Sequence, residues 1–346
     1  MSVDCRTLVC CFQLGIANLS FSRTKVLKIE HVEIEDTFAE AFTMRFARLI
    51  VTAIDSYWLR AGLNEFCGYG TSVIACDAEV GVEQYLDESQ TIDRRPGAAV
   101  LLFAFNEDAL GKALIARCGQ CLMTCPTTAV FNGMESGLEP EIEPEAKTAV
   151  EAETLSSLPL GKHLRFFGDG FQKSKRIGDR RYWRIPVMDG EFLVEEACSV
   201  AKGVAGGNFL IQSVDQETGL AAARRAIESI DAFPGVITPF PGGVVRSGSK
   251  VGSKYKGMVA STFDQFCPTL KGRVESRVHE DANCVYEIVI DGIDSKHVSD
   301  AMAGGIKACV GEGVVVVSAG NYGGKLGKHH FHLRQILGNP KKDDKD

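Results

Sequence analysis

One carboxylate stands in the middle of a stretch that otherwise has the composition of a buried β-strand, residues 283–290. Side chains alternate faces along a strand, so Glu287 shares its face with Val285 and Val289. A carboxyl group between two valines is partly desolvated, which raises its pKa and lets it stay protonated near neutral pH. In that form it can donate a hydrogen bond or a proton to a reacting oxygen or nitrogen. The alternative is a glutamate on an edge strand whose side chain faces water.

Glycine is the second informative residue type, because many of the 36 glycines are clustered. Glycine lets the backbone approach a ligand closely and present bare N–H groups. The clusters lie at residues 67–71, 167–170, 203–208, 241–243, 247–254 and 321–327. None has the spacing of a P-loop or of a dinucleotide-binding fingerprint, so we expect no nucleotide. Tight turns between sheets are the alternative explanation for some of the clusters.

A flexible basic segment overlaps two of these clusters. Residues 239–256 combine glycines with Arg246, Lys250, Lys254 and Lys256. Such a segment suits the anionic, polycarboxylate tail of a substrate, because guanidinium and ammonium groups form charge-assisted hydrogen bonds with carboxylates. A solvated loop is the alternative.

The elements that must position these residues occur in the same order twice. In the first half we expect strands at 48–54, 71–76, 98–105 and 121–131, and helices at 56–65 and 107–118. In the second half we expect strands at 208–214, 235–246, 285–290 and 313–319, and helices at 217–230 and 295–310. Both halves have the order β-α-β-β-α-β, which predicts an α+β protein of two tandem ferredoxin-like lobes with antiparallel sheets.

These elements also suggest the division of the chain. We expect a poorly ordered N-terminal extension at 1–30, a first lobe at 31–187, a second lobe at 188–338 and a tail at 339–346. Within the first lobe, residues 135–158 are rich in glutamate and contain few large apolar residues, which predicts an acidic, solvated loop.

Composition excludes several classes of function. A net charge of -7 argues against nucleic acid as a partner, and no apolar run approaches the roughly 20 residues that a membrane span requires. The 12 cysteines lie mostly in apolar runs without framework spacing, which indicates a reducing, cytoplasmic setting. Cys118 and Cys121 have C-x-x-C spacing, but no second pair follows, and the histidines at 329–332 lack a carboxylate partner. We therefore expect no metal.

Taken together, the motifs resemble those of the formylmethanofuran:tetrahydromethanopterin formyltransferases. The matching segments are 34–42, 70–74, 119–121, 166–170, 206–209, 239–243, 249–254 and 318–327. The resemblance extends from about Val32 to about Leu337. Residues 246–256 and 330–334 are most similar to the bacterial branch of the family.

The resemblance implies reversible transfer of a formyl group between N5 of tetrahydromethanopterin and the amine of methanofuran or an analogue, with both C1 carriers as co-substrates. It also implies a homotetramer and similarity to one subunit of a formyltransferase/hydrolase complex that feeds formate production. Amine attack on a formamide requires an oxyanion donor and a group of raised pKa, and the sequence offers no convincing catalytic triad. Glu287 falls on the family's Tyr-Glu strand position, so the resemblance and the strand pattern select the same acid or hydrogen-bond donor.

The resemblance further implies a set of substrate-binding residues. They are Gly70, Thr71, Ser72, Gln120, Gly206, Gly207, Asn208, Gly242, Gly243, Arg246, Ser249, Lys250, Ser253, Lys254, Asn321, Tyr322 and Lys325. Three positions depart from the usual pattern, and one of them is Gln265, which replaces a small residue. Phe263 stands where relatives commonly carry asparagine, which bears on substrate contacts, and Arg94 stands where they carry glycine, which bears on a turn.

Two other hypotheses remain open. A non-catalytic subunit that binds a pterin or furan cofactor inside a larger complex is favoured only by the Phe263 region, whereas the intact Glu287 motif favours the enzyme. A tandem of amino-acid-sensing modules leaves the basic, glycine-rich segment unexplained.

Overall fold

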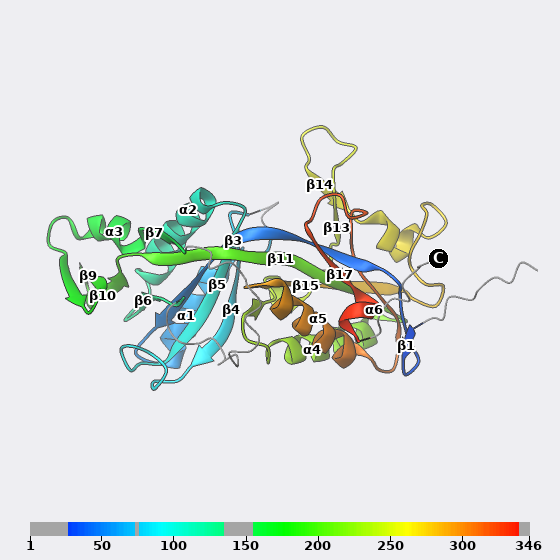
Figure 1. Ribbon diagram of the computed structural model, residues 1–346, viewed down its shortest axis with the longest axis horizontal. Coiled ribbons are helices and arrows are strands. Elements are labelled where there is room, and N and C mark those ends of the chain that lie inside the picture. Colours follow the sequence, from blue (N-terminus) through cyan, green and yellow to red (C-terminus); the bar gives the residue numbers. More distant parts are fainter. Residues whose placement is uncertain (1–26, 73–75, 135–154, 339–346) are drawn as a thin grey trace, which may run out of the picture.

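The computed structural model describes residues 27–72, 76–134 and 155–338 (Figure 1). The strands are β1 (Leu27–Ile29), β2 (Val32–Ile34), β3 (Phe38–Thr52), β4 (Glu79–Leu86), β5 (Gly97–Ala104), β6 (Ala129–Asn132), β7 (Ser156–Leu158), β8 (Lys173–Ile177), β9 (Arg180–Val187), β10 (Gly190–Glu195), β11 (Cys198–Ser213), β12 (Val236–Ile237), β13 (Ser249–Val251), β14 (Ala260–Thr262), β15 (Cys284–Gly292), β16 (Val314–Ser318) and β17 (His329–His332). The α-helices are α1 (Ser56–Cys67), α2 (Glu107–Arg117), α3 (Leu160–Leu164), α4 (Gln216–Ile230), α5 (Ser295–Cys309) and α6 (Leu333–Ile336). This is a mixed α+β fold, which confirms the predicted class.

Across the described ranges, we find no helix that combines the length and the apolar character needed to cross a membrane.

The four long helices begin in the same way. Asp55, Asn106, Asp215 and Asp294 precede α1, α2, α4 and α5, and each side chain accepts a hydrogen bond from the backbone N–H groups of the first turn. Such a cap satisfies donors that have no partner inside the helix. The sequence therefore sets where each helix starts, directly after a strand.

Two groups of strands each carry a pair of helices. In the first group, β3 pairs with β5 and β6, and β5 pairs with β4. In the second group, β11 pairs with β15 and β16, and β15 pairs with β12. Apolar side chains of α1 and α2 form one core with the first group, and those of α4 and α5 form another with the second. Each group therefore has one face covered by helices and one face without them.

Two long strands join the groups. The middle of β3 pairs antiparallel with the first half of β11, from Phe42 opposite Ala205 to Phe46 opposite Ala201. As Figure 1 shows, both strands run along the long axis of the molecule from one helix pair to the other. In the part of the chain that is described, 15 strands thus form one continuous sheet.

A buried ion pair reinforces this junction. Arg48 of β3 donates two hydrogen bonds to Glu83 of β4, at 2.8 and 2.9 Å, and both side chains are almost fully buried. Glu83 also accepts the backbone N–H of Gly235, which precedes β12, at 2.7 Å. The carboxylate therefore links the two strand groups and leaves neither charge unpaired.

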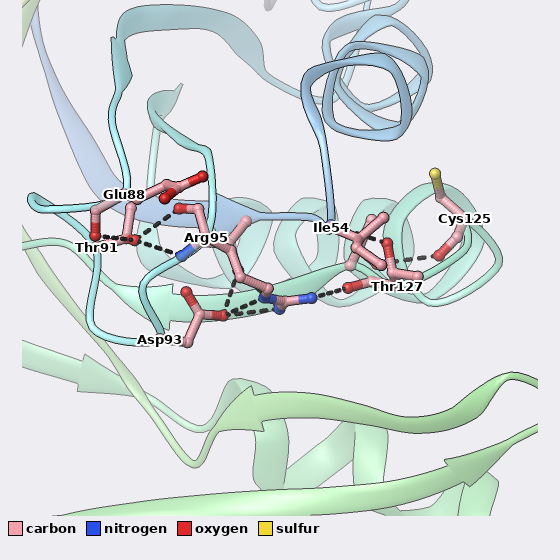
Figure 2. Close-up of polar contacts among 9 residues, drawn as sticks. Ile54, Glu88, Thr91, Asp93, Arg95, Cys125 and Thr127 are labelled. Carbon is pink, nitrogen blue, oxygen red and sulfur yellow. Dashed lines mark hydrogen bonds and ion pairs between the residues drawn. The ribbon is translucent and has the colours of Figure 1, made fainter.

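At the far end of the first group, an arginine holds a long turn in place. Figure 2 shows Arg95 between Asp93 and Thr127: its guanidinium pairs with Asp93 Oδ2 at 2.7 Å and donates to the Thr127 carbonyl. Arg94 beside it adopts a left-handed backbone, with φ at 59°. Glycine adopts this conformation more readily than arginine does. The turn therefore keeps the backbone conformation that favours glycine although arginine stands at this position.

Several predicted elements differ from the observed ones. Of the strand predicted at 71–76, the described residues Thr71, Ser72 and Cys76 lie outside any strand, and residues 73–75 lie outside the described part. The next strand, β4, begins only at Glu79. The N–H of Cys76 donates to the Ser72 carbonyl at 2.6 Å. The strand predicted at 121–131 begins as a π-helical turn, Cys118–Leu122, and becomes β6 at Ala129. The strand predicted at 235–246 is reduced to β12 and a single bridge at Val245.

The predicted spacers also need correction at their edges. The acidic loop was expected to reach residue 158, but β7 pairs with the start of β11, Ser157 opposite Ser199. The N-terminal extension was expected to reach residue 30, but β1 pairs with β2. The rest of both segments, and the tail 339–346, lie outside the described residues.

Candidate active site

Glu287 lies in the interior of the second strand group. Its backbone pairs on one side with Leu210 of β11. On the other side its N–H donates to the Val245 carbonyl at 3.0 Å, and its carbonyl accepts the Val245 N–H at 2.7 Å. The alternative of an edge strand is therefore wrong.

The predicted alternation along this strand is confirmed. Cys284, Tyr286, Ile288 and Ile290 are buried toward the helices, whereas residues 285, 287 and 289 are partly exposed on the opposite face. Burial raises the pKa of Glu287 to about 7, because a desolvated carboxylate is disfavoured. Near neutral pH this carboxyl group is therefore protonated in a substantial fraction of molecules.

Glu287 shares the helix-free face with two further sheet residues. Across the sheet, Glu287 stands opposite Leu210, which in turn stands opposite Ser318 of β16. After β16, Ala319 and Gly320 lead into the glycine-rich segment predicted to bind substrate, residues 321–327. This segment then leads into β17, which pairs with the start of β3.

A buried carboxylate fills the inside of that segment. Glu40 of β3, only 2% exposed, accepts four backbone N–H groups. Its Oε2 accepts from Tyr322 at 2.7 Å and Gly324 at 2.9 Å, and its Oε1 accepts from Leu326 and Gly327, both at 2.6 Å. Burial alone would raise the pKa of Glu40, but the four backbone donors outweigh it and hold that pKa below its usual value.

Tyr322 connects this segment with Glu287. Burial raises the pKa of the Tyr322 phenol, and the negative charges of Glu287 and then Glu40 raise it further. The Tyr322 side chain therefore lies within electrostatic range of the Glu287 carboxyl group and remains a hydrogen-bond donor at physiological pH.

Two predicted ligands, Asn208 and Asn321, use their side chains within the protein. The Asn208 amide donates to the Gly320 carbonyl at 3.1 Å and accepts its N–H at 2.6 Å. The Asn321 amide donates to Thr37 Oγ1 and to the Phe38 carbonyl. Both sets of hydrogen bonds fix the beginning of the glycine segment, at Gly320 and Asn321.

The predicted glycines at 206 and 207 lie where β11 passes from β3 to β15. Gly206 has a φ of 91°, and its N–H donates to Asp291 Oδ1 at 2.9 Å. A Cβ atom at Gly207 would stand 2.4 Å from Val298 of α5, so packing alone requires glycine there. Burial raises the pKa of Asp291, and a side-chain hydrogen bond with Glu79 of β4 opposes that rise.

One part of the basic segment, β13, pairs with β14 in a two-stranded hairpin that stands away from the main sheet in Figure 1. Ser249, Lys250, Ser253 and Lys254 lie in or next to β13, and Lys254 is exposed. Lys250 pairs with Asp264 at 2.7 Å, and Ser253 Oγ accepts the Tyr255 N–H at 3.1 Å. Next to the hairpin, the Phe263 ring lies close to Gly320: a Cβ atom built on Gly320 would stand 3.5 Å from Phe263 Cε1.

Gly242, Gly243 and Arg246 precede the hairpin. The two glycines form a 3₁₀ turn, Pro241–Gly243, with positive φ. Burial raises the pKa of Tyr286, on the face of β15 opposite Glu287, and the positive charge of the exposed Arg246 opposes that rise. Lys325 is exposed on the glycine segment that carries Tyr322.

The remaining predicted ligands belong to the first strand group. Gly70, Thr71 and Ser72 lie between α1 and β4, where the Gly70 carbonyl accepts the Val80 N–H. That places them near Glu79, and so near Asp291. Gln120 lies instead in the turn after α2, at a largely apolar cavity of about 1060 Å³ that Phe167, Pro186 and Met188 also line. None of the residues that line this cavity belongs to β15 or to the glycine segment.

Sequence reasoning missed Glu40 and Asp291. Both carry a carboxylate inside a predominantly apolar strand, which is the signal that selected Glu287. Among the described residues, no group of three or more His, Cys, Asp or Glu side chains is arranged to hold a metal ion. The site thus offers a protonatable carboxyl, a phenol and a rigid glycine segment, which suits proton donation and oxyanion stabilisation.

Two family models match the chain. One is described as formylmethanofuran-tetrahydromethanopterin formyltransferase and matches residues 27–187. The other is described as FTR, proximal lobe, and matches residues 190–336.

Characterised proteins and solved structures are also similar. A formylmethanofuran–tetrahydromethanopterin formyltransferase of Methylococcus capsulatus is 51% identical over 313 residues, which cover 89% of this chain and 99% of that protein. The formylmethanofuran:tetrahydromethanopterin formyltransferase structure from Methanosarcina barkeri has a TM-score of 0.80 and 44% identity, and the match covers 90% of this chain and all of that one. One chain of the formyltransferase/hydrolase complex from Methylorubrum extorquens, solved with methylofuran, has a TM-score of 0.83 and 44% identity over 91% of this chain and all of that one.

Proposed function

This chain belongs to the formylmethanofuran-tetrahydromethanopterin formyltransferase family, and from that premise we propose that it transfers a formyl group between N5 of tetrahydromethanopterin and the amine of methanofuran or an analogue. The observation that carries the proposal is Glu287, a partly buried carboxyl with a pKa of about 7 beside a rigid glycine segment. The matched relatives bear the name of this activity over nearly their whole length.

The reaction requires two proton movements and no covalent enzyme intermediate. The acceptor amine attacks the formyl carbon, a new C–N bond forms, and the carbonyl electron pair moves onto oxygen. The attacking nitrogen loses a proton, and the oxyanion collapses as the old C–N bond breaks and the departing nitrogen gains a proton. Protonated Glu287 can stabilise the oxyanion by a hydrogen bond or supply the proton to the departing nitrogen.

The predicted substrate contacts are proposed in three places. Tyr322, Lys325 and the backbone of residues 206–208 border the reacting centre. The hairpin residues Ser249, Lys250, Ser253 and Lys254, together with Arg246 and the turn at 242–243, suit the anionic tails of the C1 carriers. Gly70, Thr71 and Ser72 approach the centre from the first strand group, and Gln120 is assigned only by its motif.

We also propose that the two strand groups are ferredoxin-like lobes, with the first at 31–187 and the second at 188–338. The strand orders β4-β5-β3-β6 and β12-β15-β11-β16 support this division, as does the break between the two matched family models. Similarity to a chain of a formyltransferase/hydrolase complex supports assembly with other subunits, and family membership supports a homotetramer. The nine described cysteines are free thiols, in keeping with a cytoplasmic location.

Formyl transfer by the purified chain tests the function directly. We expect the wild type to transfer the formyl group from formyl-tetrahydromethanopterin to methanofuran, and Glu287→Gln to lower kcat about a hundredfold with the fold retained. Transfer that survives the substitution would leave the enzyme in place and remove the role of Glu287. A folded wild type that binds the pterin without transferring the formyl group would identify a non-catalytic binding subunit.

A further inference from the structure

The glycine segment takes its shape from one side chain that lies far away in the sequence. Glu40 accepts N–H groups from four residues that lie 282 to 287 positions later in the sequence. The segment also lies tightly over β3: a Cβ atom at Gly327 would stand 2.4 Å from the Ala41 carbonyl. Gly323 and Gly324 both have positive φ, which folds the chain around the carboxylate.

A carboxylate suits this arrangement better than any neutral side chain. Its two oxygens offer about four acceptor sites and no donor, and here each oxygen accepts two N–H groups. A glutamine of the same shape would turn an NH₂ group toward two of these backbone donors. Those donors would lose their partners, and the segment would have to move to find others.

The segment carries Tyr322, whose phenol lies within electrostatic range of Glu287. Tyr322 donates its own N–H to Glu40 Oε2, so the backbone that orients the phenol is itself fixed by Glu40. The charged and titratable groups around the segment come from three strands: Glu40 from β3, Glu287 from β15, and His330 of β17, which bonds the Gly327 carbonyl at 3.2 Å. Of these, only Glu40 contacts the backbone of Tyr322.

We propose that Glu40 is a positioning residue for formyl transfer: its carboxylate holds residues 321–327 in the shape that keeps the Tyr322 phenol beside Glu287. Tyr322 then serves as a second hydrogen-bond donor to the formyl oxygen, next to Glu287, as that oxygen becomes negative in the tetrahedral intermediate. Two preorganised donors stabilise the developing charge without reorganising at the moment of reaction. This inference rests on the proposed formyl transfer.

The experiment is a double-mutant cycle on kcat, with Glu40→Gln, Tyr322→Phe and the double variant assayed for formyl transfer. We expect each single variant to lower kcat about tenfold or more while KM changes less, since a donor to the oxyanion acts only in the transition state. If Glu40 acts through Tyr322, the double variant loses little more than Tyr322→Phe alone. Multiplied losses in the double variant, an effect on KM alone, or an unchanged kcat in either single variant would overturn the proposal.

Glu195→Gln is the matched control for loss of a buried carboxylate. Glu195 is 6% exposed, pairs with Arg180 and accepts the Asn132 N–H at 2.8 Å. It ends β10, which pairs with β6 rather than with β15. Its substitution removes the same charge, and we expect kcat to remain unchanged.

If Glu40→Gln does not fold, Asn321→Ala replaces it in the cycle, because it removes the bonds to Thr37 and Phe38 that hold the same segment. A wild type without activity would refute the function itself, whereas an active wild type with a multiplicative cycle would refute only the role of Glu40.

Discussion

Glu40 and Glu287 lie in strands that both pair with β11, and both lose water on folding, yet their pKa values move in opposite directions. The difference lies in the donors. Four backbone N–H groups surround the Glu40 carboxylate and keep it charged. Among the described residues, none donates a hydrogen bond to the Glu287 side chain, and desolvation alone raises its pKa to about 7. Burial therefore sets how strongly a carboxyl responds to its surroundings, and the available donors set whether it keeps its proton.

The largest expected effect concerns the pH dependence of catalysis. If protonated Glu287 is the donor, the ratio of the wild-type rate to the Glu287→Gln rate should fall about tenfold per pH unit above pH 7, because the glutamine side chain does not titrate. Taking the ratio cancels the titration of the substrate amine, which both proteins share. A ratio that stays constant between pH 6 and pH 9 would mean that Glu287 does not act through its proton.

The second prediction concerns stability and the charged member of the comparison. Glu40→Gln should lower the free energy of unfolding at pH 7 by about 2 kcal/mol, because two backbone N–H groups lose their acceptor. The pKa of Glu40 is lowered in the folded protein, so the stability that it contributes is present above the unfolded pKa and is lost as pH falls through the folded value. Urea unfolding at pH 7 and pH 3 should therefore give a smaller difference between the two proteins at the lower pH.

The strand that carries Glu287 was predictable from the sequence because its signal is local. Alternation over a few residues is enough to assign faces, and the four long helices are preceded by Asp or Asn residues that cap them. The partner of Glu40 was not predictable in this way. An isolated glutamate in an apolar strand indicates that a compensating group exists, but the compensating N–H groups are more than 280 residues away and belong to no periodic element.

Local sequence patterns also gave wrong predictions where the residue types of a segment do not match its observed conformation. The sequence 71–76 is apolar and β-branched, as in a strand, but its described residues, Thr71, Ser72 and Cys76, lie outside any strand. The beginnings of β3 and β11 contain glycine, threonine and charged residues, so their composition hid the long strand pair that joins the two halves. Pairing between distant strands stabilises such segments, and no single-strand pattern records it.

The third prediction is that replacing Glu287 raises the free energy of unfolding, whereas replacing Glu40 lowers it. The pKa of Glu287 is raised in the folded protein, so its contribution to stability is present below the unfolded pKa and is lost as pH rises through about 7. Glu287→Gln should therefore be more stable than the wild type at pH 8, by about 3 kcal/mol, and equally stable near pH 4. Thermal unfolding at both pH values measures the difference. Equal stability at pH 8 would show that Glu287 is well solvated, which would remove the basis for its role as an acid.

The smallest expected effect concerns Asp291, which combines features of both carboxyls. It accepts one backbone N–H, from Gly206, and shares a hydrogen bond with the carboxyl of Glu79 across the junction of the two strand groups. Two carboxyls in contact retain one proton between them. The free energy of unfolding should therefore fall less as pH rises through the raised pKa of Asp291 than it does through the pKa of Glu287. Asp291→Asn keeps both hydrogen bonds without that proton. It should match the wild type at pH 3, below the unfolded pKa of aspartate, but exceed its stability at pH 8 by less than about 1 kcal/mol. Glu79→Gln should behave in the same way if the proton is shared, since either amide can replace the protonated partner. A gain for one variant and a loss for the other at pH 8 would show that a single carboxyl holds the proton, and that the junction depends on one residue as the glycine segment depends on Glu40.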